Sequence, residues 1–140
     1  MSYATSAALQ AALYTALSSD PATLSATGGH VYDALPDGTV PDLYLILGSE
    51  RARDASDMTG RGAWHDVTVA VVSDAAGFRS AKEAAGAASD ALDGADLPLT
   101  RGRLVSLRFA RARARRQSDG SRRIDLTFRA RVEDNPQATE

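Results

Sequence analysis

The sequence predicts an α/β protein of the α+β type, with two helices packed on a four-stranded, largely antiparallel sheet in the order α-β-β-α-β-β. Three observations support this class: two segments with helical apolar spacing, two short strand-like runs in the first half, and a long arginine-rich β-hairpin near the C-terminus. The 140 residues are 44% hydrophobic, enough for one core, so we expect a single domain over residues 1–140.

The first element is an amphipathic helix over about residues 4–18. Leu9, Leu13 and Leu17 recur every four residues and form one apolar stripe. Pro21 disfavours a helical residue before it and so ends this helix. Residues 21–41 are rich in Gly, Pro, Asp and Thr, which predicts a long connection with at most a short extended piece at 30–32.

Two strands follow in the predicted order. Residues 43–47 form a continuous apolar run, the pattern of a strand buried on both faces. Residues 64–73 alternate for most of their length and form the second strand. Between them, residues 49–62 contain Met58 as the only large apolar side chain, and too little apolar surface is available to offset the entropy of ordering. We therefore expect a mobile loop over about 49–63.

The second helix follows from a stripe with steps of three and four residues, and Gly94 can cap its C-terminal end. The stripe is mostly alanine, which allows this helix to lie close to the sheet. It consists of Phe78, Ala81, Ala85, Ala88 and Leu92. At the other end of the chain, we expect residues 133–140 to form a frayed tail.

The last two strands form a hairpin over residues 104–132, because Asp119-Gly120 between two β-patterned runs is a strong turn signal. If these are the two central turn residues, Arg113 faces Leu126, and arginines oppose large apolar side chains toward the tip. Alanines of the first strand then share the other face with polar residues of the second. A bulge near Phe109 would exchange the two faces of one strand, and the sequence leaves that alternative open.

Charge is distributed very unevenly along the chain. Residues 101–131 hold eleven arginines, no lysine and two acids, a net charge of +9, whereas the rest holds five basic and sixteen acidic residues, a net charge of −11. Such asymmetry indicates two unlike surfaces that meet partners or other copies. A protein interface is the favoured interpretation; a solvated hairpin that protects a sheet edge and a nucleic-acid contact are the alternatives. The predicted interface residues are Arg51, Arg53, Met58, Arg111, Arg113, Arg115, Arg116, Arg122 and Arg123.

The sequence contains none of the strong catalytic signatures: no phosphate loop, zinc-protease motif, serine nucleophile elbow or cysteine pair. His30 with Asp33, or His65 with Asp66, would form an acid-base pair only beside a nucleophile or cleft, so each histidine is assigned to a turn or strand edge. Cysteine is absent, and the acids at 90, 93 and 96 lack the spacing of a calcium loop. We predict no catalytic residue, metal or cofactor, and no membrane span.

Several segments together resemble a known family. They are the opening helix 9–17, the turn and extended piece 29–33, the strand 41–48, the run 64–69, the alanine-rich helix after Gly77 and the closing hairpin. The chain resembles the tail-completion or tail-terminator proteins of long-tailed bacteriophages and gene transfer agents.

The resemblance implies a structural virion protein rather than an enzyme. Proteins of this kind form a hexameric ring on the last ring of tail-tube subunits, stop tube growth and join the tube to the head connector. The implied partners are other copies of the chain, the tail-tube protein and the head-tail connector, with a non-specific contact to DNA that passes through the ring. The implied location is the head-proximal end of the tail in a particle, after synthesis in the bacterial cytoplasm. A nucleic-acid-binding module that uses the arginine hairpin is the alternative.

Overall fold

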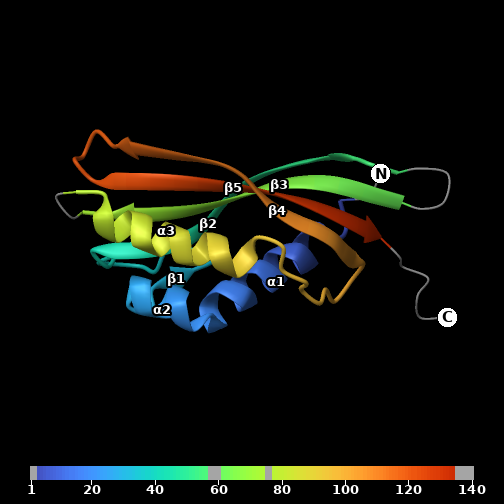
Figure 1. The fold of residues 1–140 in the computed structure, drawn as a ribbon, viewed down its shortest axis with the longest axis horizontal. Coiled ribbons are helices and arrows are strands. Elements are labelled where there is room, and N and C mark those ends of the chain that lie inside the picture. Colours follow the sequence, from blue (N-terminus) through green and yellow to red (C-terminus); the bar gives the residue numbers. More distant parts are fainter. Residues whose placement is uncertain (1–2, 57–60, 75–76, 135–140) are drawn as a thin grey trace.

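The computed structural model describes residues 3–56, 61–74 and 77–134. Within these ranges three helices lie together on one face of a five-stranded sheet, and no helix covers the other face (Figure 1). In chain order the elements are α1 (Ser6–Ser19), α2 (Pro21–Thr27), β1 (Val31–Tyr32), β2 (Leu43–Asp54), β3 (Arg61–Ser73), α3 (Arg79–Leu92), β4 (Arg103–Arg116) and β5 (Arg122–Asp134).

The strand order in the sheet is β1-β2-β3-β5-β4. The short β1 runs parallel to β2, and all other neighbours are antiparallel. The α+β class and the largely antiparallel sheet are confirmed. The predicted order α-β-β-α-β-β is wrong in detail, because the described residues contain one more helix, α2, and one more strand, β1.

The additional helix α2 lies in the segment that was expected to be a connection. Asp20 caps it, since its carboxylate accepts a hydrogen bond from the Thr23 backbone nitrogen at 2.9 Å. Pro21 occupies the first turn, where its missing N–H costs nothing, and Gly28 ends the helix with φ +65°. The residues that end α1 are therefore also the residues that start α2.

The core lies between the helices and the sheet. Leu9, Leu13 and Leu17 of α1 are buried as predicted, and so is the alanine stripe of α3 with Leu92. From the sheet, alternate residues of β3 and β5 complete the same cluster, including the fully buried Phe128. No helix in the described ranges has the length and apolar character that crossing a membrane would require.

Strand β2 is much longer than predicted. The expected loop over 49–63 is strand at residues 49–54, in β2, and at 61–63, in β3. A bulge between Leu47 and Glu50 shifts the register, after which Arg51 and Arg53 pair with Asp66 and Trp64. Ladder hydrogen bonds and polar contacts order this segment in place of apolar burial. Met58 lies outside the described residues.

Two smaller expectations also change. Leu45 and Leu47 of β2 are buried, but Tyr44 and Ile46 are only half-buried, because their face of the sheet carries no helix. At the other end of the chain, Glu133 and Asp134 belong to β5 rather than to a frayed tail. Their carboxylates pair with Arg103 at 2.8 Å and Arg101 at 3.0 Å, and residues 135–140 lie outside the described ranges.

The β4–β5 hairpin has a three-residue turn, 118–120, in place of the predicted two-residue turn. The Gln117 backbone nitrogen donates to the Ser121 carbonyl at 2.8 Å, which closes the loop around these residues. Gly120 has φ +91°, whereas no described non-glycine residue has a positive φ. A two-residue type I′ turn requires a positive φ at both central positions, so Asp119 excludes it. Consequently Arg113 faces Asp125 instead of Leu126.

The bulge that the sequence left open is present, between Phe109 and Arg111. Beyond it, Ala112 and Ala114 lie opposite Leu126 and Ile124 on the helix side of the sheet. The arginines of β4 that alternate with these alanines therefore point to the face without helices. The predicted arrangement of arginine against large apolar residues is wrong, because the three-residue turn shifts the register near the tip by one residue. The bulge shifts it by one more residue toward the base, where Leu107 again faces the helix side.

Candidate assembly interface

Arginines gather on the face of the sheet that carries no helix. On β5, Phe128 and its alternate neighbours are buried in the core, so the residues between them point the other way. Opposed residues of β2 and β4 share that direction. We call the resulting surface the arginine face. It contains Arg51, Arg53, Arg111, Arg113, Arg115, Arg123, Arg129 and Arg131, together with Asp66 and Asp125.

Trp64 organises one end of the arginine face. The guanidinium carbons of Arg53, Arg129 and Arg131 lie 5.7, 6.0 and 5.3 Å from a ring centroid of Trp64. Arg129 also donates to Asp66 at 3.1 Å. Cation–π contacts at exposed sites contribute about 0.5–1 kcal/mol each. They hold three positive charges in place and occupy the indole ring that would otherwise be free to stack on a ligand.

The hairpin tip forms the other end of the arginine face. Asp125 accepts from Arg123 at 3.0 Å and lies 3.6 Å from Arg115. Arg111 and Arg113 are exposed and form no ion pair within the described residues. At the tip, positively charged side chains therefore outnumber carboxylates. A partner surface with negative charge would be complementary to this excess.

Two predicted interface residues at the tip point to the helix side. Arg116 is exposed there and lies opposite Arg122. Arg122 is only 8% exposed: its guanidinium lies 5.5 Å from the Phe78 ring centroid and donates to the Gly120 carbonyl at 2.8 Å. Packing against Phe78 and bracing of the turn account for this burial.

Six of the nine predicted interface residues, Arg51, Arg53, Arg111, Arg113, Arg115 and Arg123, are therefore on one surface but in two groups. Arg51 and Arg53 lie near Trp64, which pairs with Arg131, whereas the hairpin tip pairs with the far end of β3. Together the two groups extend along β3 from the level of Trp64 to that of Val72, eight residues or about 26 Å at about 3.3 Å per residue. Sequence patterning missed the contribution of Arg129 and Arg131, although their alternation with Phe128, Ala130 and Val132 carried the signal.

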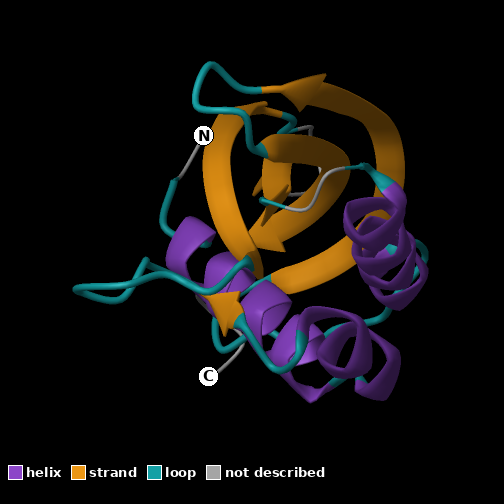
Figure 2. Ribbon diagram, turned by 90° about the vertical axis from the view of Figure 1, so that its left-hand side faces the viewer, coloured by secondary structure: helices purple, strands orange, loops and turns teal. Residues whose placement is uncertain are grey.

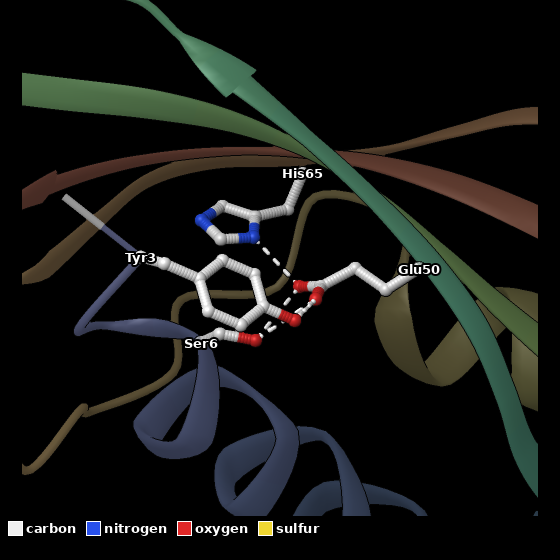
Figure 3. A network of polar contacts seen from close by, with 4 residues as sticks. All are labelled: Tyr3, Ser6, Glu50 and His65. Carbon is white, nitrogen blue, oxygen red and sulfur yellow. Dashed lines mark hydrogen bonds and ion pairs between the residues drawn. The ribbon is translucent and has the colours of Figure 1, made fainter. Parts of the chain in front are cut away.

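A partly buried polar network fixes the distal half of β2 (Figure 3). The Glu50 carboxylate accepts hydrogen bonds from Tyr3 and from Ser6, the latter at 2.9 and 3.0 Å, and lies 2.6 Å from His65 Nδ1. His65 is fully buried, and the Tyr3 ring stacks on it at 6.3 Å between centroids. The network ties the start of the chain to β2 and β3, beside the strand positions that carry Arg51 and Arg53.

The protonation of Glu50 follows from these contacts. Burial raises the pKa of its carboxyl group, but the bonds from Tyr3, His65 and Ser6 outweigh burial and leave the pKa below its ordinary value. The hydroxyl groups of Tyr3 and Ser6 both donate to this carboxylate, so the arrangement presents a satisfied anion rather than a base beside a free nucleophile. His65 does not pair with Asp66, whose partner is Arg129.

Acidic side chains form a contrasting surface. Asp33, Asp37 and Asp42 lie in the loop between β1 and β2, and all three are exposed. The loop contains no basic residue. The loop leads into β2 at Leu43, which is level with the hairpin tip, so the negative loop and the positive tip lie at the same end of the sheet with β3 between them.

Comparison with known proteins shows which family this chain belongs to. Residues 11–133 match the family model described as Tail completion protein gp17. The chain belongs to the tail completion family. This tail completion protein is also similar, with a TM-score of 0.90 and 56% identity, to a chain in a solved structure described as the virion of a native gene transfer agent (GTA) particle. The similarity covers 94% of this chain and 99% of that one. No match was found among curated protein sequences.

The family that the sequence resembled is therefore confirmed, and the tail completion protein has a structural role in a tail. The regions that carried the resemblance, the opening helix, the 64–69 run and the closing hairpin, all lie in regular elements of the fold. The arginine face and the acidic loop are the surfaces of this tail protein that remain to be assigned to contacts.

Proposed function

We propose that the protein is a tail terminator: six copies form a ring that caps the tail tube and joins it to the head connector. The similarity to a gene transfer agent virion chain, 56% identical along nearly the whole length, is the observation that carries the proposal. We accordingly assign the protein to the tail of a phage or gene transfer agent particle. Its partners are then other copies of itself, the tail-tube protein and the head-tail connector.

The distribution of charge supports a ring. A closed ring built from one kind of subunit needs a heterologous interface, in which one patch contacts a different patch on the next copy. The arginine-rich hairpin and the acidic loop provide two unlike patches with complementary charge. Two copies related by a two-fold axis would instead bring a patch against itself, which is unfavourable for a surface of like charges.

The hairpin can be tested by charge reversal. In the double variant Arg113→Glu and Arg115→Glu, the net charge of each copy falls by four units, and we expect the fold to be retained because both positions are exposed. We expect this variant to be absent from purified particles and tails to remain unattached to heads, as judged by immunoblotting and electron microscopy. Arg79→Glu is the control, because Arg79 is 91% exposed and belongs to α3 rather than to either strand of the hairpin. Normal incorporation of the double variant would contradict a hairpin interface.

Nucleic-acid binding is the second candidate function, and the arginine face is the observation that favours it. Arg53, Arg129 and Arg131 could contact a phosphate backbone, including DNA that passes through the ring. Their position around Trp64 leaves this ring unavailable for base stacking, so binding would be electrostatic and without sequence preference. Anisotropy titrations of random duplex DNA decide between the two: tight binding that weakens steeply with salt, by a chain that never assembles, would favour the second candidate.

A further inference from the structure

A shallow apolar groove lies between α3 and the distal half of the β4–β5 hairpin. Its volume is about 320 Å³, and Gly86 and Ala85 of α3 face Phe109, Ala112 and Ala114 of β4 across it. The groove exists because both walls carry small side chains. The bulge after Phe109 is the cause on the strand side, since it turns alanines rather than arginines toward the helix.

The residues around the groove indicate which chemical properties a bound segment must have. Phe109 is 41% exposed at one end, so the groove offers an apolar contact. Lys82 lines it, and exposed Arg116 lies on the same side of the hairpin. Across the strand, Arg111 and Arg113 have no carboxylate partner among the described residues. A segment that fits here combines apolar side chains with negative charge.

The loop 33–42 has this combination. It carries Asp33, Asp37 and Asp42 and no basic residue, and it exposes two large apolar side chains, Leu35 at 46% and Val40 at 39%. Within the described part of the chain, residues 34–41 form no hydrogen bond to the rest of the protein. The loop projects from the body beside the short strand β1 (Figure 2). These two exposed apolar side chains on one projecting loop are available for a contact with another molecule.

The loop of the same copy does not fill the groove, because none of the groove-lining residues belongs to loop 33–42 and the loop projects away from α3 (Figure 2). Direct pairing of sheet edges is a weaker alternative. It would place Arg51 and Arg53 of one copy against Arg111 and Arg113 of the next, and like charges in such proximity are unfavourable. Charge complementarity therefore selects the loop as the occupant.

We propose that loop 33–42 of each copy docks in the α3–β4 groove of the next copy. Leu35 and Val40 enter the groove against Phe109 and the alanines of β4, and the loop carboxylates meet the neighbouring cations. This contact rests on the proposed ring and specifies its subunit interface. It is heterologous, so its repetition gives a ring where the rotation between copies closes, rather than a two-fold dimer.

Cysteine cross-linking tests the contact directly, because the natural chain has no cysteine. Particles are assembled with the double variant Leu35→Cys and Ala112→Cys, oxidised and run on a non-reducing gel. The expected result is a ladder of cross-linked chains up to the hexamer, since each copy joins two neighbours. The matched control replaces Ala112→Cys by Val105→Cys, on the same strand, 43% exposed and outside the groove, and should give no ladder.

A second variant tests the proposal if the cysteine variant does not assemble. Gly86 is helical, it lines the groove, and a Cβ placed on it meets nothing within 4 Å, so we expect Gly86→Leu to extend into the groove and to leave the fold intact. We expect about tenfold fewer copies per particle for Gly86→Leu than for Gly86→Ala, corresponding to about 1.4 kcal/mol of lost contact. Normal incorporation of Gly86→Leu would overturn the docking proposal, as would rings whose reactive thiols fail to cross-link. Particles that hold no ring of this protein would instead overturn the proposed function.

Discussion

Replacing Glu50 by alanine should destabilise the protein by about 3 kcal/mol. The substitution removes the acceptor of three polar contacts, from Tyr3, Ser6 and the buried His65. A buried polar group left without its partner costs about 1–3 kcal/mol, which applies to His65 Nδ1. Tyr3 and Ser6 can be solvated again, so each lost bond costs only about 0.5–1.5 kcal/mol. The Glu50 side chain is 15% exposed, and water can offset part of this total.

Urea unfolding at pH 7, followed by circular dichroism, measures the effect as a change in midpoint at constant slope. Glu50→Gln keeps an acceptor for His65 and should lose less than half as much stability. Arg51→Ala is the matched control, because Arg51 is the next residue on β2 but points to the exposed face, and its removal should change stability by at most about 0.5 kcal/mol. A loss below about 1 kcal/mol for Glu50→Ala, or an equal loss for Arg51→Ala, would refute the role assigned to this network.

Three further predictions concern stability. Because the folded-state pKa of Glu50 is depressed, its contribution is present above the unfolded value of about 4.5 and is lost as pH falls through the lower folded value. Unfolding free energies measured on both sides of that pH should therefore fall more steeply on acidification in the wild type than in Glu50→Gln, and parallel profiles would contradict this. Gly102→Ala should lose about 2 kcal/mol or more, because φ is +77° and the new Cβ would lie 2.6 Å from the Glu133 carbonyl oxygen. Gly86→Ala, in open helical space, should gain about 0.5–1 kcal/mol, and melting temperatures that rank these two variants in the opposite order would contradict both assignments.

The elements that sequence patterning predicted well are those in which apolar spacing alone decides the outcome. Leu9, Leu13 and Leu17 could only form one buried stripe, and the alanine stripe of α3 likewise had one apolar side. The helix α2 was missed although its signals were present, because Asp20-Pro21 was taken as the end of one helix and not also as the beginning of another. A seven-residue helix depends more on such caps than on periodicity.

The interface was predicted less completely, because it depends on contacts between distant segments. Nothing near Glu50 in the sequence indicates that Tyr3 and His65 will surround it, so the strand that carries Arg51 and Arg53 was expected to be a loop. A one-residue difference in turn length reversed the faces of the hairpin, which no alternation pattern could settle. The number of arginines was evident from the sequence. That most of them share one face of the sheet could be known only from the strand register.

The central proposal, a ring of this protein at the end of the tail, is tested most directly by cryo-electron microscopy of purified particles that carry a tagged copy of the chain. The expected result is a closed ring of six copies between the tail tube and the head connector, with every copy in contact with two neighbours. Density for the chain at the distal tip of the tail, or as isolated copies without neighbours, would contradict the proposal.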